Sequence, residues 1–323
     1  MYNKRLFLSD ESKSLNLSHN KITNIQGLIF PPKLESLNLD NNYITEIRHT
    51  VFPDGLKELL LFNNKIELID GLILPDSLKI IDLDKNEIKD ISDFRLPLHL
   101  NSFDISNNYI RYLNNIKFNN QLIYLNLSCN FIDSINNIIW PSSLQTLILS
   151  YNNITSLNHV VFNNGLLTLN ISYNEIRDIG DCTWPHTLLF LFIGYNKLGS
   201  YINNLPHSLQ DLCLDFNMIN DVSNFILPPN LKSLSLNYNL ISSIKNVLWS
   251  DSLNSLYLMN NQISKDSCFS DIQMFSKNRT LIIFEFIKCH DFLYKYSSRY
   301  DLFNLTSIIL SFIDYDFQFN III

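Results

Sequence analysis

One phrase, Leu-x-x-Leu-x-Leu-x-x-Asn-x-Ile, recurs along most of this 323-residue chain. Successive copies lie 22 residues apart, except for one interval of 21 residues between Asn196 and Asn217. The asparagines that mark the copies are Asn20, Asn42, Asn64, Asn86, Asn108, Asn130, Asn152, Asn174, Asn196, Asn217, Asn239 and Asn261. A fixed period of this length is typical of solenoids, in which each repeat forms one coil and packs against its neighbours. The sequence therefore predicts a stack of about twelve coils.

Each framework position of the repeat has a physical explanation. Pairs such as Leu37 and Leu39 alternate with polar residues, which is the period-two pattern of a short strand with one buried face. The asparagine follows this strand, where its amide can satisfy backbone groups that are too buried to be left unpaired. We therefore expect a parallel β-sheet on the concave face of the stack, with a ladder of asparagines along its edge.

The other half of each repeat carries an apolar residue, often aromatic, that a proline usually follows, as in Phe30–Pro31 and Trp140–Pro141. Proline fixes φ and has no amide hydrogen, so we expect this half to be extended or a turn of 3₁₀-helix. The predicted fold is thus mostly β, with extended or 3₁₀ return segments on the convex face and little α-helix.

This pattern resembles the leucine-rich repeat family over residues 13–265. The short unit is most similar to repeats of the phosphatase-regulator type and to the Leu-Pro-bearing repeats of bacterial effectors. Pro-x-Ser-Leu phrases at 75–78, 141–144 and 206–209 also resemble FNIP repeats, although the Phe-Asn-x-Pro element of that family is absent. The resemblance implies a leucine-rich-repeat solenoid that binds a ligand on its concave sheet, and it leaves the ligand open.

The two ends of the chain differ from the repeats. Residues 1–12 are expected to form an N-terminal cap with one irregular strand around Leu6 and Leu8. Residues 266–323 are rich in aromatic residues, and Leu281 to Ile287 has the pattern of a strand. We expect this segment to cap the hydrophobic end of the solenoid. A small appended module and a surface for self-association are the alternatives.

Composition and charge exclude several classes of function. The formal net charge is −7, and Lys and Arg form no cluster that could bind the phosphates of a nucleic acid. No uncharged apolar run is long enough to span a bilayer, so no membrane association is expected. The five cysteines show no zinc or redox spacing, and the first ten residues lack the apolar core of a signal peptide. We therefore expect an intracellular, reducing environment, that of the cytoplasm.

The side chains between the framework leucines should face solvent on the concave sheet, where they form three columns without Lys or Arg. Two groups stand out as candidate partner-binding residues. The acidic group comprises Asp40, Asp82, Asp84 and Asp104. The aromatic group comprises Phe190 and Phe192 with a column beside the asparagine ladder, Tyr151, Tyr173, Tyr195, Phe216 and Tyr238. Exposed aromatic residues are typical of protein-binding hot spots. The alternatives are that the tyrosines only stack on one another and that the aspartates only solvate the face.

The sequence favours a non-catalytic scaffold, a regulator or an effector, that binds a basic or amphipathic protein segment. Catalytic motifs are missing: there is no phosphate-binding glycine loop, no Gly-x-Ser-x-Gly and no His-Glu-x-x-His, and no cofactor or metal is expected. One alternative is a cysteine-dependent enzyme whose activity lies in the C-terminal segment, around Cys268, Cys289 and His290. Another is a structural protein that self-assembles, and the sequence does not determine the oligomeric state.

Overall fold

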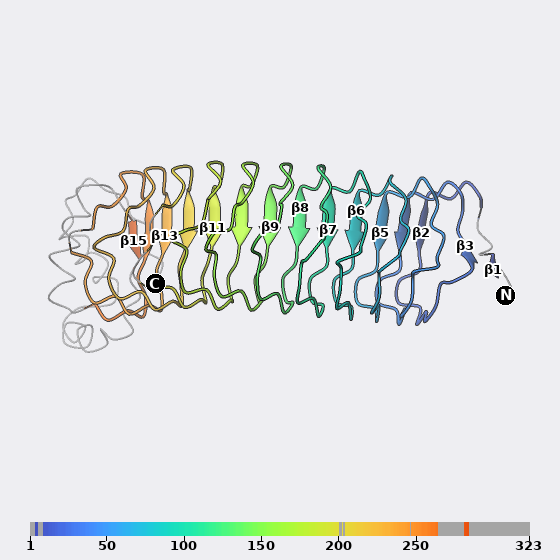
Figure 1. The fold of residues 1–323 in the computed structure, drawn as a ribbon, viewed down its shortest axis with the longest axis horizontal. Helices are drawn as coiled ribbons and strands as arrows, with labels where there is room; N and C mark the ends of the chain where they lie inside the picture. Colours follow the sequence, from blue (N-terminus) through green and yellow to red (C-terminus); the bar gives the residue numbers. More distant parts are fainter. Residues whose placement is uncertain are drawn as a thin grey trace, which may run out of the picture. The chain divides into compact units, whose positions relative to one another are not determined.

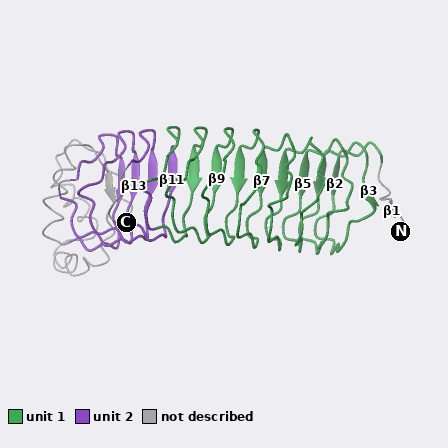
Figure 2. Cartoon of the chain, in the orientation of Figure 1, with its two compact units in different colours: residues 1–176, 181–188 green, residues 177–180, 189–323 purple. Residues whose placement is uncertain are grey.

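The computed structural model describes residues 4–5, 9–199, 202, 204–245, 247–263 and 281–283. Within this part the chain forms fifteen short strands and no helix (Figure 1). The chain divides into two compact units, shown in different colours in Figure 2. Unit 1 comprises residues 1–176 and 181–188, and unit 2 comprises residues 177–180 and 189–323.

Unit 1 is a stack of coils that presents a parallel sheet. Each coil contributes one strand of three residues, and neighbouring strands pair in register, so that Leu37 lies opposite Leu59 and Asp82 lies opposite Asp104. The strands of this sheet are β2 (Ser14–Asn16), β4 (Ser36–Asn38), β5 (Glu58–Leu60), β6 (Ile80–Asp82), β7 (Ser102–Asp104), β8 (Tyr124–Asn126), β9 (Thr146–Ile148) and β10 (Thr168–Asn170). Two further strands, β1 (Lys4–Arg5) and β3 (Leu28–Ile29), pair in parallel in a separate small sheet.

Unit 2 repeats the same arrangement. Its parallel strands are β11 (Phe190–Phe192), β12 (Asp211–Cys213), β13 (Ser233–Ser235), β14 (Ser255–Tyr257) and β15 (Leu281–Ile283). The shorter interval between Asn196 and Asn217 does not disturb the register. The framework leucines Leu191 and Leu212 still lie opposite each other, like those of the 22-residue repeats. Strand β15 confirms the start of the strand predicted from Leu281, and the remainder of that prediction lies outside the described residues, as do Leu6 and Leu8.

The period-two pattern explains the core of each unit. In every strand from β2 to β14, except β3, the central residue is buried while its two neighbours are more exposed. The second leucine of each pair, such as Leu39 or Leu127, is also fully buried. Burying one such side chain contributes about 1.5–3 kcal/mol, and every coil repeats this contribution. The predicted parallel sheet with one buried face is therefore confirmed.

The asparagine ladder is also confirmed. The Nδ2 group of Asn86 donates to the carbonyl oxygens of Leu61 and Leu83 at 2.9 and 3.0 Å, and its Oδ1 atom accepts from the backbone N–H of Ile66 at 3.0 Å. Asn108 and Asn130 make the same set of bonds one and two coils further on. Each amide thus satisfies backbone groups of its own coil and of the preceding coil, which no apolar residue could do.

The return half of each coil is extended and carries the predicted aromatic residues. In unit 1 their rings stack from coil to coil: Phe118 and Trp140 have centroids 5.8 Å apart, and Phe162 and Trp184 also 5.8 Å apart. The prolines that follow start tight turns, in which the N–H of Leu144 donates to the carbonyl of Pro141 at 3.1 Å. No helix forms among the described residues of the return segments, in agreement with the effect of proline on the backbone.

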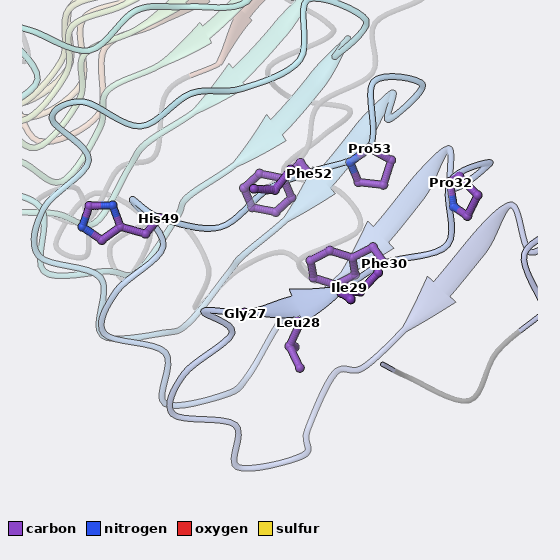
Figure 3. A pocket seen from close by; sticks show the side chains of 9 residues that line it. Gly27, Leu28, Ile29, Phe30, Pro32, His49, Phe52 and Pro53 are labelled. Atoms are coloured by element: carbon purple, nitrogen blue, oxygen red, sulfur yellow. The ribbon is translucent and has the colours of Figure 1, made fainter. Parts of the chain in front are cut away.

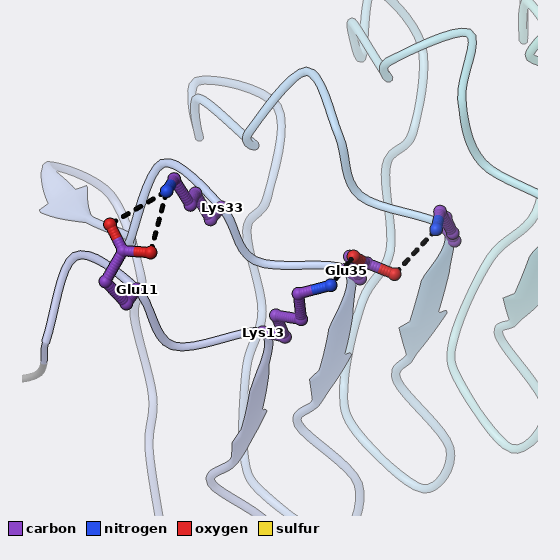
Figure 4. Close-up of polar contacts among 5 residues, drawn as sticks. Glu11, Lys13, Lys33 and Glu35 are labelled. Carbon is purple, nitrogen blue, oxygen red and sulfur yellow. Dashed lines mark hydrogen bonds and ion pairs between the residues drawn. The ribbon is translucent and has the colours of Figure 1, made fainter.

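A chain of ion pairs joins the first coils of unit 1 ahead of their strands (Figure 4). Glu35 lies between Lys13 and Lys57, at 2.9 and 2.6 Å, and Lys33 pairs with Glu11 at 2.7 Å. Hydrogen bonds from Lys57 and Lys13 lower the pKa of the Glu35 carboxyl to about 2. The lysines and Glu11 are exposed and Glu35 is partly exposed, so the contribution of these ion pairs to stability is small and depends on salt.

Candidate functional site

The solvent face of the sheet in unit 1 carries an acidic patch, which we define as Asp82, Asp84 and Asp104. Asp82 and Asp104 are paired residues on β6 and β7, and Asp84 follows β6 by two residues. The structure therefore brings together three of the four predicted aspartates. Asp40 lies two coils before Asp84 in the same column, and its Oδ1 atom accepts a bond from the backbone N–H of Phe62 at 2.8 Å.

Neutral polar groups hold these carboxylates. Ser106 Oγ donates to Asp104 at 2.6 Å and to Asp84 at 3.0 Å. The Nδ2 groups of Asn107 and Asn126 donate to Asp84 and Asp104 at 2.7 and 2.8 Å. Among the residues that the structure describes, no ion pair involves a carboxylate of the acidic patch.

The same turn is built elsewhere with an amide instead of a carboxylate. Asp82 and Asp104 each accept a bond from the backbone N–H two residues on, at 2.9 and 3.0 Å. Asn38 and Asn126 accept the equivalent bond at 2.9 and 3.0 Å in their own coils. An asparagine would therefore satisfy the fold at both acidic positions, and the negative charges are not needed for this turn.

The electrostatics show that the charge at Asp82 opposes folding. Burial raises the pKa of the Asp82 carboxyl to about 6, and the nearby carboxylates of Asp104 and Asp84 add to the rise. Burial also raises the pKa of the Tyr124 hydroxyl on the neighbouring strand β8, and Asp104 contributes. A group whose charged form is disfavoured by its surroundings is a candidate for binding an opposite charge.

Apolar side chains border the acidic patch, and the sequence analysis did not single them out. Leu60 pairs with Asp82 in register on β5, and Ile80 begins β6 with 40% of its surface exposed. Phe62 lies in the column between Asp40 and Asp84, and Lys85 Nζ lies 5.1 Å from the centre of its ring. Their positions in the sequence could have indicated them, because they fall in the solvent-facing columns of the sheet, where the fold does not require an apolar residue.

The residue that directly precedes each ladder asparagine in the sequence has an unusual backbone conformation. Every residue at this position has a positive φ, from 49° at Asn107 to 58° at His19. In the first coils Asn, which tolerates this conformation, is common there. From Tyr151 to Tyr238 the position is aromatic, and an aromatic residue in the left-handed region costs roughly 1–2 kcal/mol. The aromatic members are Tyr151 and Tyr173 in unit 1, and Tyr195, Phe216 and Tyr238 in unit 2.

Within each unit these rings stack on one another. The centroids of Tyr151 and Tyr173 are 4.0 Å apart in unit 1. In unit 2, Phe216 lies 4.0 Å from both Tyr195 and Tyr238. The alternative interpretation, that these residues stabilise one another by stacking, therefore has a structural basis. Their outer edges stay accessible, because Tyr195 and Tyr238 are 38% and 41% exposed.

Phe190 and Phe192 lie on the solvent face of unit 2, at the two ends of strand β11. Phe190 is half-buried and Phe192 is 36% exposed. We define Phe190, Phe192, Tyr195, Phe216 and Tyr238 as the aromatic patch, all of whose members belong to unit 2. Their role as binding residues stays a prediction.

Nucleophilic and metal chemistry finds little support in the described part. Burial raises the pKa of the Cys182 thiol to about 12 and that of Cys213 to about 11, so neither forms a thiolate readily. No group of His, Cys, Asp and Glu side chains in the described segments could hold a metal ion. Cys268, Cys289 and His290 lie outside the described residues, so the cysteine-dependent alternative stays a prediction.

A shallow apolar pocket of about 290 Å³ lies on the return side of the first coils (Figure 3). Its walls include Phe30 and Phe52, whose rings stack 6.0 Å apart, and His49 is its one ionisable residue. None of the predicted binding residues lines it. In the described residues we also find no helix of the length and hydropathy that a membrane span requires.

Comparison with known proteins agrees with the fold. The family model for the leucine rich repeat matches residues 32–88 and 142–198. No curated protein matches the chain. Among solved structures, an internalin from Listeria monocytogenes is 26% identical with a TM-score of 0.70, and the match covers 84% of this chain and 80% of that one.

Two further structures show how far the likeness extends. YopM from Yersinia enterocolitica is 27% identical with a TM-score of 0.50, over 75% of this chain and 60% of YopM. The LRIM1/APL1C complex is 20% identical with a TM-score of 0.65, over 94% of this chain and 64% of the other. In both cases the chain spans less than two thirds of the matched chain. The period, the buried asparagine ladder, the parallel sheet and these matches show that the chain is a leucine-rich repeat protein.

Proposed function

We propose that this protein is a non-catalytic interaction scaffold and that the acidic patch of unit 1 binds a protein segment carrying Lys or Arg. Leucine-rich repeat folds typically serve as protein-binding scaffolds, and the LRIM1/APL1C structure was solved as a complex. The observation that carries the proposal is the presence of carboxylates where asparagine serves the same turn in other coils. The charge of Asp82 is unfavourable in the free protein, and a bound cation would make it favourable.

The surroundings of the patch favour an amphipathic segment over an isolated charge. A Lys or Arg side chain that reaches Asp82 and Asp104 can lay its aliphatic stem along Leu60 and Ile80. Phe62 offers a further apolar contact on the same face. An extended segment in which cationic and aliphatic side chains alternate would match this surface, because charge complementarity supplies specificity and apolar contact supplies affinity.

We propose the aromatic patch of unit 2 as a second contact surface, for an apolar segment. Its support is backbone conformation: three of its members adopt positive φ where Asn would be less strained. Strain of this kind tends to persist at functional sites. Stacking of two neighbouring rings stabilises the fold by about 0.5–1.5 kcal/mol per pair. This is comparable to the backbone strain, so the aromatic residues add little net stability.

The test uses the full chain and a synthetic array of extended peptides in which Lys alternates with aliphatic residues. A matched array carries Gln in place of each Lys. We expect the Lys array to bind, and the double variant Asp82→Asn and Asp104→Asn to lose that binding. A control variant, Asp93→Asn with Asp251→Asn, removes the same charge from exposed turns and should bind like the parent. Equal binding by all three proteins would overturn the proposal for the acidic patch.

The aromatic patch is tested separately by replacing Phe190 and Phe192 with serine. The measurement is affinity capture from a lysate, followed by mass spectrometry. Specific partners of the parent should be missing from the capture with this variant or with the acidic double variant, and a protein that carries all four substitutions should capture none of them. Partners retained by the fourfold variant would place the binding surface elsewhere.

A further inference from the structure

The return turns of neighbouring coils are joined by a second set of side-chain bonds. Thr187 Oγ1 donates to the carbonyl oxygens of Asn164 and Leu166, both at 2.8 Å. Ser77 makes the same pair of bonds to its preceding coil. In the coil that contains residues 163–166 the hydroxyl is missing, and Asn163 Nδ2 donates instead to the carbonyls of Ser142 and Leu144, at 3.3 and 3.1 Å.

This exchange dictates the glycine at position 165. A Cβ atom on Gly165 would lie 2.4 Å from the carbonyl oxygen of Ser142 and 3.1 Å from Asn163 Nδ2. No L side chain can be accommodated that close to a backbone oxygen. The requirement creates the one Asn-Gly pair in the sequence, Asn164–Gly165. Asn164 is exposed, and its side chain forms no hydrogen bond with the described residues.

We propose that Asn164 is a site of spontaneous deamidation, with water as the co-reactant. The backbone nitrogen of Gly165 loses its proton and forms a bond to Cγ of Asn164. The bond from Cγ to the side-chain nitrogen breaks, and that nitrogen takes up a proton and leaves as ammonia, which gives a cyclic succinimide. Water then adds to one of the two succinimide carbonyls and opens the ring. Opening on one side gives an aspartyl residue, and opening on the other gives an isoaspartyl residue in which the main chain runs through Cβ and Cγ. Glycine favours the reaction because no side chain shields its nitrogen.

The two products should affect the coil differently. Asp54, Asp76 and Asp251 occupy the equivalent turn position in other coils, so the aspartyl product fits the fold. The isoaspartyl product adds a methylene to the main chain of the turn. This addition displaces the carbonyls that Thr187 binds and loosens the junction between two coils of unit 1. Deamidation therefore adds negative charge and, in its isoaspartyl form, weakens the stack locally.

The experiment incubates the full folded chain in mildly alkaline buffer and follows each asparagine by peptide mapping with mass spectrometry. Asn120 is the internal control, since it is exposed at the equivalent turn position but precedes Gln121. We expect Asn164 to convert at least tenfold faster than Asn120, to yield both aspartate and isoaspartate, and to convert faster as pH rises. A variant with Asn164→Ser, the residue type that Ser142 places in the same turn, should keep its unfolding midpoint during incubation while that of the parent falls. Conversion of Asn164 no faster than that of Asn120 in the folded chain would overturn the proposal.

Discussion

The carboxylate of Asp82 accepts a 2.9 Å hydrogen bond from the backbone N–H of Asp84, and Asp104 lies opposite Asp82 on the neighbouring strand β7. The turn needs an acceptor oxygen and does not need a charge. Because four other coils build this turn with Asn16, Asn38, Asn126 and Asn170, the charge can be removed without removing the bond.

Asp82→Asn should stabilise the folded protein at neutral pH. The folded-state pKa of Asp82 is about 6, against an ordinary value of 3.8, so its contribution to stability is complete below pH 3.8 and is lost as the pH rises through 6. The variant should therefore need a higher urea concentration to unfold at neutral pH. Its free energy of unfolding should exceed that of the parent by about 1 kcal/mol, after allowance for solvent screening of a half-buried group. The advantage should disappear in acid. A variant less stable than the parent at neutral pH would contradict this account.

The reciprocal change, Asn38→Asp, tests the same reasoning from the other side. Position 38 keeps its acceptor oxygen but gains a charge on the same half-buried face, two coils from Asp82. We expect stability at neutral pH to fall and to recover as the new carboxyl is protonated. Urea unfolding across the acidic range measures this directly, and a pH-independent difference would argue for a packing defect instead.

The asparagine ladder should be intolerant of truncation. Replacing Asn108 with alanine leaves the N–H of Ile88 and the carbonyls of Leu83 and Ile105 without their partner in a buried position. We expect a loss of about 3 kcal/mol. The exposed Asn114 is the matched control, and its alanine variant should stay within about 0.5 kcal/mol of the parent in the same denaturant titration.

The aromatic column allows strain and stacking to be separated. In Phe216→Asn the lost stacking is offset by relief of the positive φ, so stability should change by less than about 1 kcal/mol. Phe216→Ala loses both stacks and keeps the strain, so it should be clearly less stable than the asparagine variant. Thermal unfolding of the two variants side by side decides the point; equal stability would mean that the left-handed backbone carries no strain.

The ion-pair chain at Glu35 predicts a small, salt-sensitive effect. Its pKa is lowered to about 2, so the stabilisation is present above its ordinary value of 4.5 and is lost only as the pH falls through 2. Glu35→Gln should lower the melting temperature slightly in dilute buffer, and high salt should abolish the difference. A difference that persists in high salt would show that Glu35 contributes by packing.

The sequence was sufficient for the parts of the fold that follow from periodicity. Buried residues such as Leu37 and Leu125, the parallel register and the ladder amides all follow from the 22-residue phrase. The positive φ at Tyr195 or Phe216 does not, because an aromatic residue is a poor indicator of that conformation. Its indirect signal was the frequent asparagine at the same position in earlier coils, such as Asn41 and Asn63.

The acidic patch was predictable in its membership and not in its energetics. Column positions alone place Asp82 beside Asp104. The raised pKa depends on the depth of the carboxylate and on the direction of its neighbours, which three-dimensional packing determines. Likewise, the apolar border formed by Leu60, Phe62 and Ile80 becomes evident only when it is seen next to carboxylates that form no ion pair within the described part of the chain.

The most direct test of the central claim is a calorimetric titration of the strongest peptide from the Lys array into the parent chain and into the Asp82→Asn, Asp104→Asn double variant. We predict binding to the parent that weakens as salt is added, and at least tenfold weaker binding to the variant, which stays folded. The same affinity for both proteins would show that the carboxylates of unit 1 do not serve recognition.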